Sequence, residues 1–294
     1  MLLTRTYGTT GVAVSLLGFG AGHIGGSGFT EAQCATFLNG LLDAGVTLVD
    51  TARGYGLSED RIGRHLARRR GEFILSTKVG YGVEGQEDWT HACVAAGVDR
   101  ALKVLCTDHL DIVHLHSCPR EVLAQGGAIE ALEEAKAAGK IRAMAYSGEN
   151  EALETALASG RFDGVQCSLN LCDQRVLHRG LPVARERGLG FIAKRPLANA
   201  PWLWTERPLG QYCEEYWVRL RAMDLDPRDL DWQELALRFA AFQDGISSCI
   251  VGTTRLAHLE ANVRILEKGP LPPERLAEIR AAFAAHGTEW EGLI

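Results

Sequence analysis

Four residues with reactive side chains follow short apolar runs in the first half of the chain. Asp50 ends the run VTLVD, Lys78 ends FILSTK and His116 ends DIVHLH. Tyr55 comes shortly after Asp50 and stands between two glycines in RGYGL. An ionisable group at the end of a buried strand is costly unless it has a partner. The coincidence of Asp, Lys and His at successive strand ends therefore indicates a site of chemistry.

Together these residue types suit the reduction of a carbonyl group. Hydride addition places negative charge on the carbonyl oxygen, so an acid must deliver a proton and donors must hold the oxyanion. A phenol, with a pKa of about 10, is a weak acid at neutral pH, but a neighbouring ammonium favours the phenolate. We therefore expect Tyr55 to be the general acid, tuned by Lys78 and Asp50. His116 would donate a hydrogen bond that positions the carbonyl.

The role of Arg53, in the same segment, stays open between two readings. Its guanidinium could be a surface charge paired with Glu59 or Asp60. It could also stand at the rim of a pocket and attract an anionic substrate.

Short apolar runs alternate with longer amphipathic runs along the whole chain, which is typical of parallel strands joined by helices. The candidate strands cover residues 15–20, 46–50, 73–78, 111–116, 141–147, 164–169, 189–195 and 248–253. Helical patterns lie between them. Thr30 and Ser58 stand at expected N-cap positions, and Gly45, Gly139 and Gly188 stand just past expected helix ends. Eight such units favour an α/β fold, a closed (β/α)8 TIM barrel, over an open doubly wound sheet.

Three further segments complete the expected barrel. Residues 4–15, with Gly-Thr-Thr-Gly at their centre, predict an N-terminal β-hairpin. Residues 196–231, after the seventh strand, form a connection far longer than is usual, so we expect a helix within it. Residues 273–285 predict an extra C-terminal helix. We expect residues 1–294 to form a single domain of this kind.

Composition excludes several classes of function. The 294 residues carry a net charge of -6, which argues against nucleic acid or a membrane surface as the main partner. Eight cysteines include no C-x-x-C pair and lie mostly in apolar segments, so we expect reduced, buried thiols. No secretion signal or long apolar run is present. These features predict a cytoplasmic protein, monomeric by default because no interface stripe is recognisable.

Three segments resemble the aldo-keto reductase family: VDTARGYGLSEDRIG, ILSTKVG and DIVHLH, in that order and at similar spacing. Weaker similarity extends from the hairpin through GTTRLAHLEANV, so that the resemblance covers nearly the whole chain. It implies an oxidoreductase that uses NAD(P)H to reduce an aldehyde or ketone, or that oxidises the matching alcohol or sugar. The expected partner is therefore a small-molecule carbonyl or alcohol substrate.

The family binds an extended nicotinamide nucleotide across the barrel mouth without a Rossmann domain. GFGAGH, residues 18–23, matches the dinucleotide fingerprint only superficially, because a histidine replaces the third glycine and no helix follows directly. The resemblance implies that Ser147, Gln166 and Asn170 hold the nicotinamide carboxamide. For Gln166 the structural alternative is a core amide paired with backbone. Asn262 resembles the family's adenine contact.

The chain departs from the family pattern after the seventh strand. Lys194 and Arg195 stand where many relatives place an aromatic residue that stacks on the nicotinamide, and Pro196 and Leu197 complete this candidate cofactor contact. An arginine can stack through its planar guanidinium, and either cation could meet the pyrophosphate.

A second departure concerns the cofactor's phosphate. Thr253 and Thr254 precede a helix that begins near residue 256, where hydroxyl and free backbone N–H groups suit a phosphate. Gly252 and His258 stand where NADPH-preferring relatives often have a lysine and an arginine. Arg255 is then the cation left for the 2′-phosphate, and we expect NADP as cofactor, with NAD as the alternative.

Two rival functions remain open. His114 and His116 lie two apart on one strand, so both point the same way, as ligands in a metal-dependent TIM-barrel hydrolase must. Such barrels usually carry this pair on the first strand, however, and we expect no metal here. The other rival is a cofactor-binding regulatory subunit with little turnover.

Overall fold

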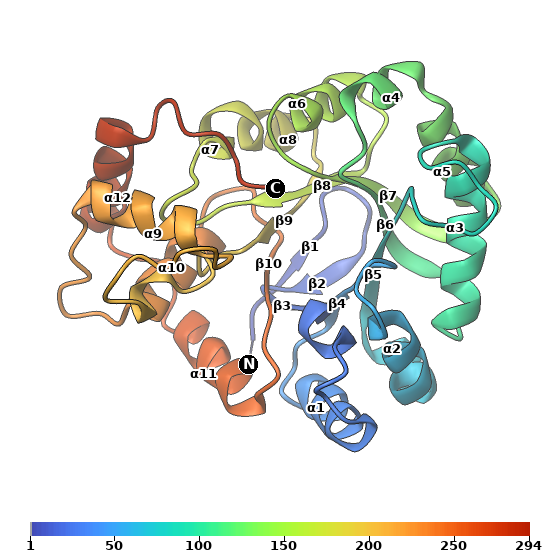
Figure 1. Ribbon diagram of the computed structural model, residues 1–294, viewed down its shortest axis with the longest axis horizontal. Coiled ribbons are helices and arrows are strands. Elements are labelled where there is room, and N and C mark those ends of the chain that lie inside the picture. Colours follow the sequence, from blue (N-terminus) through green and yellow to red (C-terminus); the bar gives the residue numbers. More distant parts are fainter. Residues whose placement is uncertain (1) are drawn as a thin grey trace.

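Eight parallel strands form a closed barrel in the computed structural model, which describes residues 2–294. Around the barrel the strands follow the order β10-β3-β4-β5-β6-β7-β8-β9, and the helices form a ring outside them (Figure 1). The strands are β3 (Leu17–Gly20), β4 (Leu48–Asp50), β5 (Ile74–Val79), β6 (Leu110–His116), β7 (Ile141–Ser147), β8 (Gly164–Ser168), β9 (Gly190–Lys194) and β10 (Ser248–Val251). The closed barrel is confirmed and the open sheet is wrong.

Helices follow the strands, as the alternation of apolar and amphipathic runs predicts. They are α1 (Glu31–Asp43), α2 (Ser58–Leu66), α3 (His91–Val104), α5 (Gly127–Ala137), α6 (Asn150–Ser159), α7 (Val176–Arg179), α8 (Leu181–Glu186), α10 (Trp232–Ala241) and α11 (Leu256–Glu267). The long connection contains α9 (Glu214–Met223), and α12 (Pro273–His286) is the extra C-terminal helix. Short 3-10 turns lie at residues 21–25, 67–72 and 201–203. A further helix, α4 (Arg120–Gln125), was not predicted.

One of the two expected N-caps is confirmed. Thr30 caps α1 through a capping box, in which its hydroxyl accepts from the Gln33 backbone N–H. Ser58 is not a cap, because it is the first residue of α2 and the cap position belongs to Leu57. Its buried hydroxyl instead donates to the Ala21 carbonyl at 2.9 Å and lies 2.8 Å from the Thr51 hydroxyl. The serine therefore ties the loop after β4 to the loop after β3.

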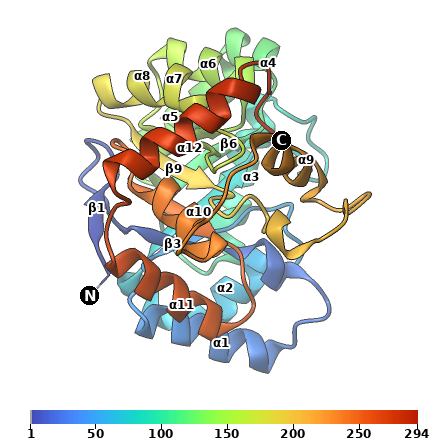
Figure 2. The ribbon, with the colours of Figure 1, turned by 90° about the vertical axis from the view of Figure 1, so that its left-hand side faces the viewer.

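A β-hairpin, β1 (Thr4–Thr6) and β2 (Ala13–Ser15), closes the amino-terminal end of the barrel as expected. Tyr7 is fully buried against the starts of β8 and β9, where a Cβ on Gly164 would lie 2.1 Å from its hydroxyl. Figure 2 shows the hairpin at one end of the barrel, and α9 and the C-terminus at the other. The hairpin leaves the opposite end free for a site.

Side chains inside the barrel change from apolar to polar along its axis. Leu48, Ile112 and Ile192 pack with the hairpin at the closed end. Side chains on a strand alternate between its two faces, so residues two or four positions closer to the carboxyl end of each strand also point into the barrel. Asp50, Lys78 and other polar residues occupy those places. The strand sequences thus place an apolar plug below a buried polar layer at the carboxyl end.

All eight cysteines are free, and all of them except the exposed Cys106 are buried. Within residues 2–294, none of the helices has the length and apolar character needed to cross a lipid bilayer.

Candidate active site

An ion pair between Asp50 and Lys78 lies at the centre of the polar layer. The Lys78 Nζ donates to Asp50 Oδ2 at 2.5 Å and to the Thr51 carbonyl at 2.8 Å, and both charged side chains are at most 2% exposed. Burial alone would lower the pKa of Lys78, but the Asp50 carboxylate and the Tyr55 phenol raise it above its usual value. Burial would raise the pKa of Asp50, but the Lys78 charge holds it low. Both groups therefore stay ionised.

Tyr55 lies over this pair. The Lys78 Nζ is 5.1 Å from the centroid of the Tyr55 ring. The loop is held tightly, because a Cβ on Gly25 would lie 1.7 Å from the Tyr55 carbonyl oxygen, and Gly56 has a φ of +56°. The phenol is partly exposed and lines a cavity, so it stands between the buried ammonium and solvent.

His116 faces the same cavity from the end of β6. Its ring centroid lies 6.0 Å from that of Tyr55 at an interplanar angle of 89°. Burial, with the nearby charges of Lys78 and Lys194, lowers the pKa of His116 to about 3. The imidazole is therefore neutral at physiological pH, and it can donate from one ring nitrogen only.

The cavity occupies about 790 Å³ at the carboxyl end of the barrel. Of the residues singled out from the sequence, it is lined by Asp50, Tyr55, His116, Gln166, Lys194, Arg195, Pro196, Leu197 and Gly252. Lys78 lies directly below it. A volume of this size accepts a drug-sized molecule or the reactive end of a nucleotide.

The three residues expected at the carboxamide are buried, and Gln166 lines the cavity whereas Ser147 and Asn170 do not. Gln166 Nε2 donates to Asp50 Oδ1 at 3.0 Å, and Gln166 Oε1 accepts from the Ser147 hydroxyl at 3.0 Å. Gln166 is thus paired with side chains rather than with backbone, and Ser147 lies behind it. The Asn170 Nδ2 is buried without a hydrogen-bond partner within residues 2–294. A buried donor of this kind is rare and fits a ligand carbonyl.

The two cations at the end of β9, Lys194 and Arg195, already contact other residues of the protein. Lys194 is 3.1 Å from the carboxylate of Glu149. The Arg195 guanidinium stacks over the Tyr212 ring, 4.8 Å from its centroid, and donates to the Leu293 carbonyl at 2.5 Å. Both side chains still line the cavity, where they leave positive potential for an anion.

The residues expected at the phosphate lie past the rim of the cavity. Thr253 Oγ1 accepts from the Arg255 N–H at 3.1 Å, next to the start of α11. Thr254, Arg255 and His258 are exposed there, and α11 has no side-chain cap on its amino terminus. Asn262 is buried and its Oδ1 accepts from Gln233 Nε2 at 2.7 Å. The free N–H groups of this helix are suited to an anion.

Several residues at the cavity were missed. His23 lines it, and a Cβ on Gly252 would lie 2.5 Å from its ring, so glycine at 252 is needed for their contact. Tyr212 and Ile294 also line it. His23 lies just beyond the end of β3, so the rule that located Asp50 would have found it. No sequence signal places Ile294.

Arg53 makes no ion pair with Glu59 or Asp60, because those carboxylates pair with Arg100 and Arg64. Within residues 2–294 the buried Arg53 Nε has no hydrogen-bond partner, and its guanidinium packs against Gly82. The pairing with Glu59 or Asp60 is therefore wrong.

The histidine pair gives no support to a metal site. His114 lies one layer deeper than His116, and its Nε2 is 3.1 Å from the Ser76 hydroxyl. Within residues 2–294, no group of three or more His, Cys, Asp or Glu side chains is arranged to hold a metal ion. The metal-dependent hydrolase is therefore not favoured.

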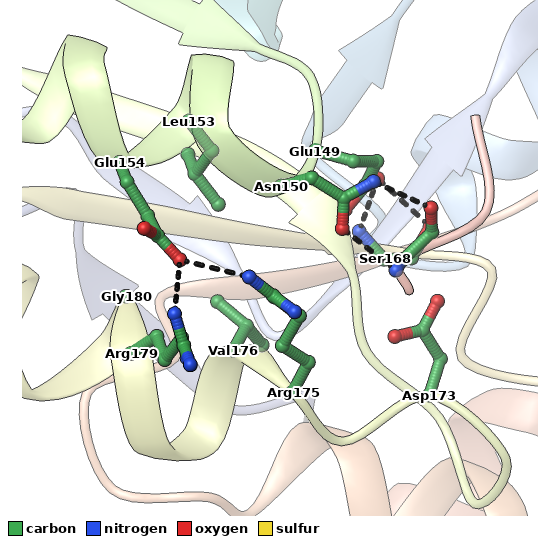
Figure 3. Close-up of a pocket in the computed structure, with 11 residues that line it drawn as sticks. Glu149, Asn150, Leu153, Glu154, Ser168, Asp173, Arg175, Val176, Arg179 and Gly180 are labelled. Atoms are coloured by element: carbon green, nitrogen blue, oxygen red, sulfur yellow. Dashed lines mark hydrogen bonds and ion pairs between the residues drawn. The ribbon is translucent and has the colours of Figure 1, made fainter. Parts of the chain in front are cut away.

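A second, small cavity lies beside the ends of β7 and β8 (Figure 3). Glu149 accepts there from the Ser168 N–H at 2.8 Å, while Asn150 and Gly292 exchange two hydrogen bonds. Asp173 accepts from the Leu293 N–H at 3.2 Å, and burial raises its pKa to about 7. This cavity, of about 20 Å³, holds roughly one water molecule. Its polar groups anchor the C-terminal residues against the barrel.

Comparisons with known proteins show the family and the fold. The model of the Aldo/keto reductase family matches residues 16–284. The chain is 27% identical to the oxidoreductase YqkF of Bacillus subtilis, over 94% of the chain and 95% of that protein. It is 28% identical to L-galactose dehydrogenase of Arabidopsis thaliana, over 94% and 93%. A holo-form aldo-keto reductase structure from Bacillus halodurans superposes with a TM-score of 0.83, 27% identity and 96% coverage of both chains.

Proposed function

The chain belongs to the aldo/keto reductase family, and from this membership we propose how it acts as an oxidoreductase. It reduces the carbonyl group of a small aldehyde or ketone, or oxidises the matching alcohol or sugar. When bound in the cavity, a nicotinamide cofactor supplies or accepts the hydride. The observation that carries the proposal is the buried Lys78–Asp50 ion pair beneath Tyr55, in a cavity that His116 also lines.

In the direction of reduction, Tyr55 delivers the proton. As negative charge develops on the carbonyl oxygen, the phenol O–H bond breaks and an alcohol O–H bond forms. The phenolate that remains is stabilised by the Lys78 ammonium. Asp50 keeps that ammonium charged and aimed, since its carboxylate is 2.5 Å from the lysine nitrogen. In the opposite direction the phenolate removes the proton from the alcohol.

His116 positions the carbonyl oxygen. Its imidazole is neutral, because burial and nearby positive charge hold its pKa at about 3. It therefore acts as a hydrogen-bond donor and not as a second acid at neutral pH. His116 lies at the end of β6, edge-on to Tyr55. Its ring N–H and the Tyr55 hydroxyl would therefore both donate to the carbonyl oxygen of the substrate.

The residues present fit a nicotinamide nucleotide across the barrel mouth. The unpaired Asn170 Nδ2 would donate to the carboxamide, and Gln166 would contact it from the wall of the cavity. Lys194 and Arg195, with Pro196 and Leu197, line the cavity and would hold the pyrophosphate. The amino terminus of α11, with Thr253, Thr254, Arg255 and His258 near it, would hold the adenosine phosphate, and Asn262 would contact the adenine. Arg255 favours NADP over NAD.

The substrate is proposed to be a small polar carbonyl compound or a sugar. Trp204 and Tyr212 give the cavity aromatic walls, which suit a sugar face or an aryl aldehyde. A relative that covers most of the chain is an L-galactose dehydrogenase, which adds aldoses to the candidates.

The test begins with a titration of the protein with NADPH and with NADH, in which the quenching of tryptophan fluorescence reports binding. A panel of aldehydes, ketones, aldoses and alcohols is then assayed with the preferred cofactor. The proposal expects saturable binding and turnover of at least one compound class. Tight cofactor binding with negligible turnover on the whole panel would instead indicate a cofactor-binding regulatory subunit.

A further inference from the structure

The phenol of Tyr81 lies against the imidazole of His116. Tyr81 Oη is 2.8 Å from His116 Nδ1, and the two ring centroids are 5.4 Å apart at an angle of 31°. Tyr81 comes three residues after Lys78, in the loop that follows β5. It stands outside the segment ILSTKVG and has no part in the proton transfer proposed above.

The surrounding loop holds this contact in place. A Cβ on Gly54 would lie 3.0 Å from Tyr81 Oη, so glycine at that position leaves room for the hydroxyl. Trp89 packs edge-on against Tyr81, with ring centroids 5.4 Å apart. Gly80, with a φ of +133°, lets Trp89 approach, because a Cβ there would lie 2.2 Å from the indole. The backbone N–H of Trp89 closes the loop by donating to the Gly80 carbonyl at 2.6 Å.

The direction of the Tyr81–His116 hydrogen bond decides what His116 offers the cavity. A neutral imidazole has one N–H and one acceptor nitrogen. Within residues 2–294, His116 Nδ1 is the only hydrogen-bond partner of the Tyr81 hydroxyl, and His116 Nε2 has none. If Tyr81 donates, the imidazole proton lies on Nε2. If His116 donates, the phenol hydrogen loses its acceptor in the protein and must turn to solvent, and Nε2 carries only a lone pair.

We propose that Tyr81 is a positioning residue that donates to Nδ1 of His116 and so keeps the ring proton on Nε2, where it meets the substrate carbonyl. The state of both groups is consistent with this arrangement. Burial raises the pKa of Tyr81, so its hydroxyl keeps its proton, and burial lowers that of His116, so its ring is neutral and one of its nitrogens can accept. The contact between Nε2 and the substrate carbonyl rests on the proposed function, whereas the tautomer of His116 does not depend on it.

Nuclear magnetic resonance of the full chain with isotope-labelled histidine tests the tautomer without any substrate. The ring signals of His116 are identified by their loss in His116→Gln. We expect the wild-type proton on Nε2, and in Tyr81→Phe a mixture of tautomers or a shift toward Nδ1. Tyr146→Phe is the control, because it also loses one phenol hydroxyl, which donates to the Cys118 carbonyl and not to His116. A wild-type proton on Nδ1, or an unchanged tautomer in Tyr81→Phe, would overturn the proposal.

Kinetics then test whether the tautomer matters for turnover. Tyr81→Phe should lower kcat by about two- to tenfold, the usual worth of one neutral hydrogen bond, with the cofactor Kd unchanged. In a His116→Gln background the same change should have no further effect, because Tyr81 acts through His116. Equal losses in both backgrounds would contradict the proposal.

Should the panel show no turnover, the proposed function fails, and the resonance experiment still decides the tautomer. It does so even if Tyr81→Phe does not fold, from the wild-type signals alone.

Discussion

The Lys78 ammonium and the Asp50 carboxylate lie 2.5 Å apart, and both side chains are at most 2% exposed. A buried pair of this kind adds little to stability compared with apolar residues, but breaking it leaves one charge without a partner. Under the proposed function, its place below Tyr55 gives it a chemical use instead. The pair keeps a positive charge fixed under the phenol, at a stability cost that a purely structural core would avoid.

Replacing Lys78 with Met should damage both folding and turnover. The lone Asp50 carboxylate should cost about 3–5 kcal/mol in the free energy of unfolding at neutral pH. The double variant Lys78→Met/Asp50→Asn removes both charges and should recover much of that loss while staying inactive. Denaturant unfolding and steady-state kinetics measure the two effects. A single variant as stable as the wild type, or a double variant with restored turnover, would refute this account of the pair.

Asp173 should make the protein less stable as the pH rises. Burial raises the pKa of this carboxyl from 3.8 to about 7, so the folded chain keeps a proton that the unfolded chain has already lost. Its contribution to the free energy of unfolding therefore falls between about pH 4 and pH 7 and stays low above that range.

Asp173→Asn should flatten that pH dependence, because an amide cannot ionise and its oxygen can still accept from Leu293. The pH dependence is measured as the thermal unfolding midpoint between about pH 4 and pH 7. A change of 1 kcal/mol in the free energy of unfolding shifts the midpoint by about 2–4 °C in a chain of this size. Asp231→Asn, at an exposed site without a capping hydrogen bond, is the control and should parallel the wild type. Parallel curves for Asp173→Asn and the wild type would show that Asp173 does not titrate in this window.

Arg255→Ala should weaken NADPH selectively. If Arg255 grips the 2′-phosphate, its loss should raise the KM for NADPH by about 10- to 100-fold, the usual effect of losing a hydrogen bond between charged groups. The KM for NADH should stay unchanged. Arg264→Ala is the matched control, since it removes an exposed arginine from α11 itself. Equal changes for both cofactors would assign Arg255 another role.

The barrel was predictable because its signals are local and repeated. Strand residues alternate, and parallel strands end at the same rim, so the polar ends of the runs at Asp50, Lys78 and His116 had to meet. Gly45 and Gly139 mark helix ends for a similar reason, since both adopt a positive φ there. The Ser58 prediction failed because its hydroxyl finds a partner far away in the sequence, at Ala21.

The rest of the cavity depends on contacts between distant segments. Ile294 reaches the mouth because Arg195 and Asp173 hold Leu293, about a hundred residues further along the chain. The contact between Tyr81 and His116 requires the particular backbone of Gly80 and Trp89, both at positive φ. No periodicity encodes such loops, so the residues around the reacting group are less predictable than the reacting group itself.

The most direct test of the central claim is the turnover of Tyr55→Phe on the best carbonyl substrate, with the cofactor Kd measured on the same sample. The account predicts a fall in kcat of about two to four orders of magnitude with cofactor binding preserved, because the variant lacks only the proton that the carbonyl oxygen must receive. Reduction of the substrate at nearly the wild-type rate would show that another group supplies the proton.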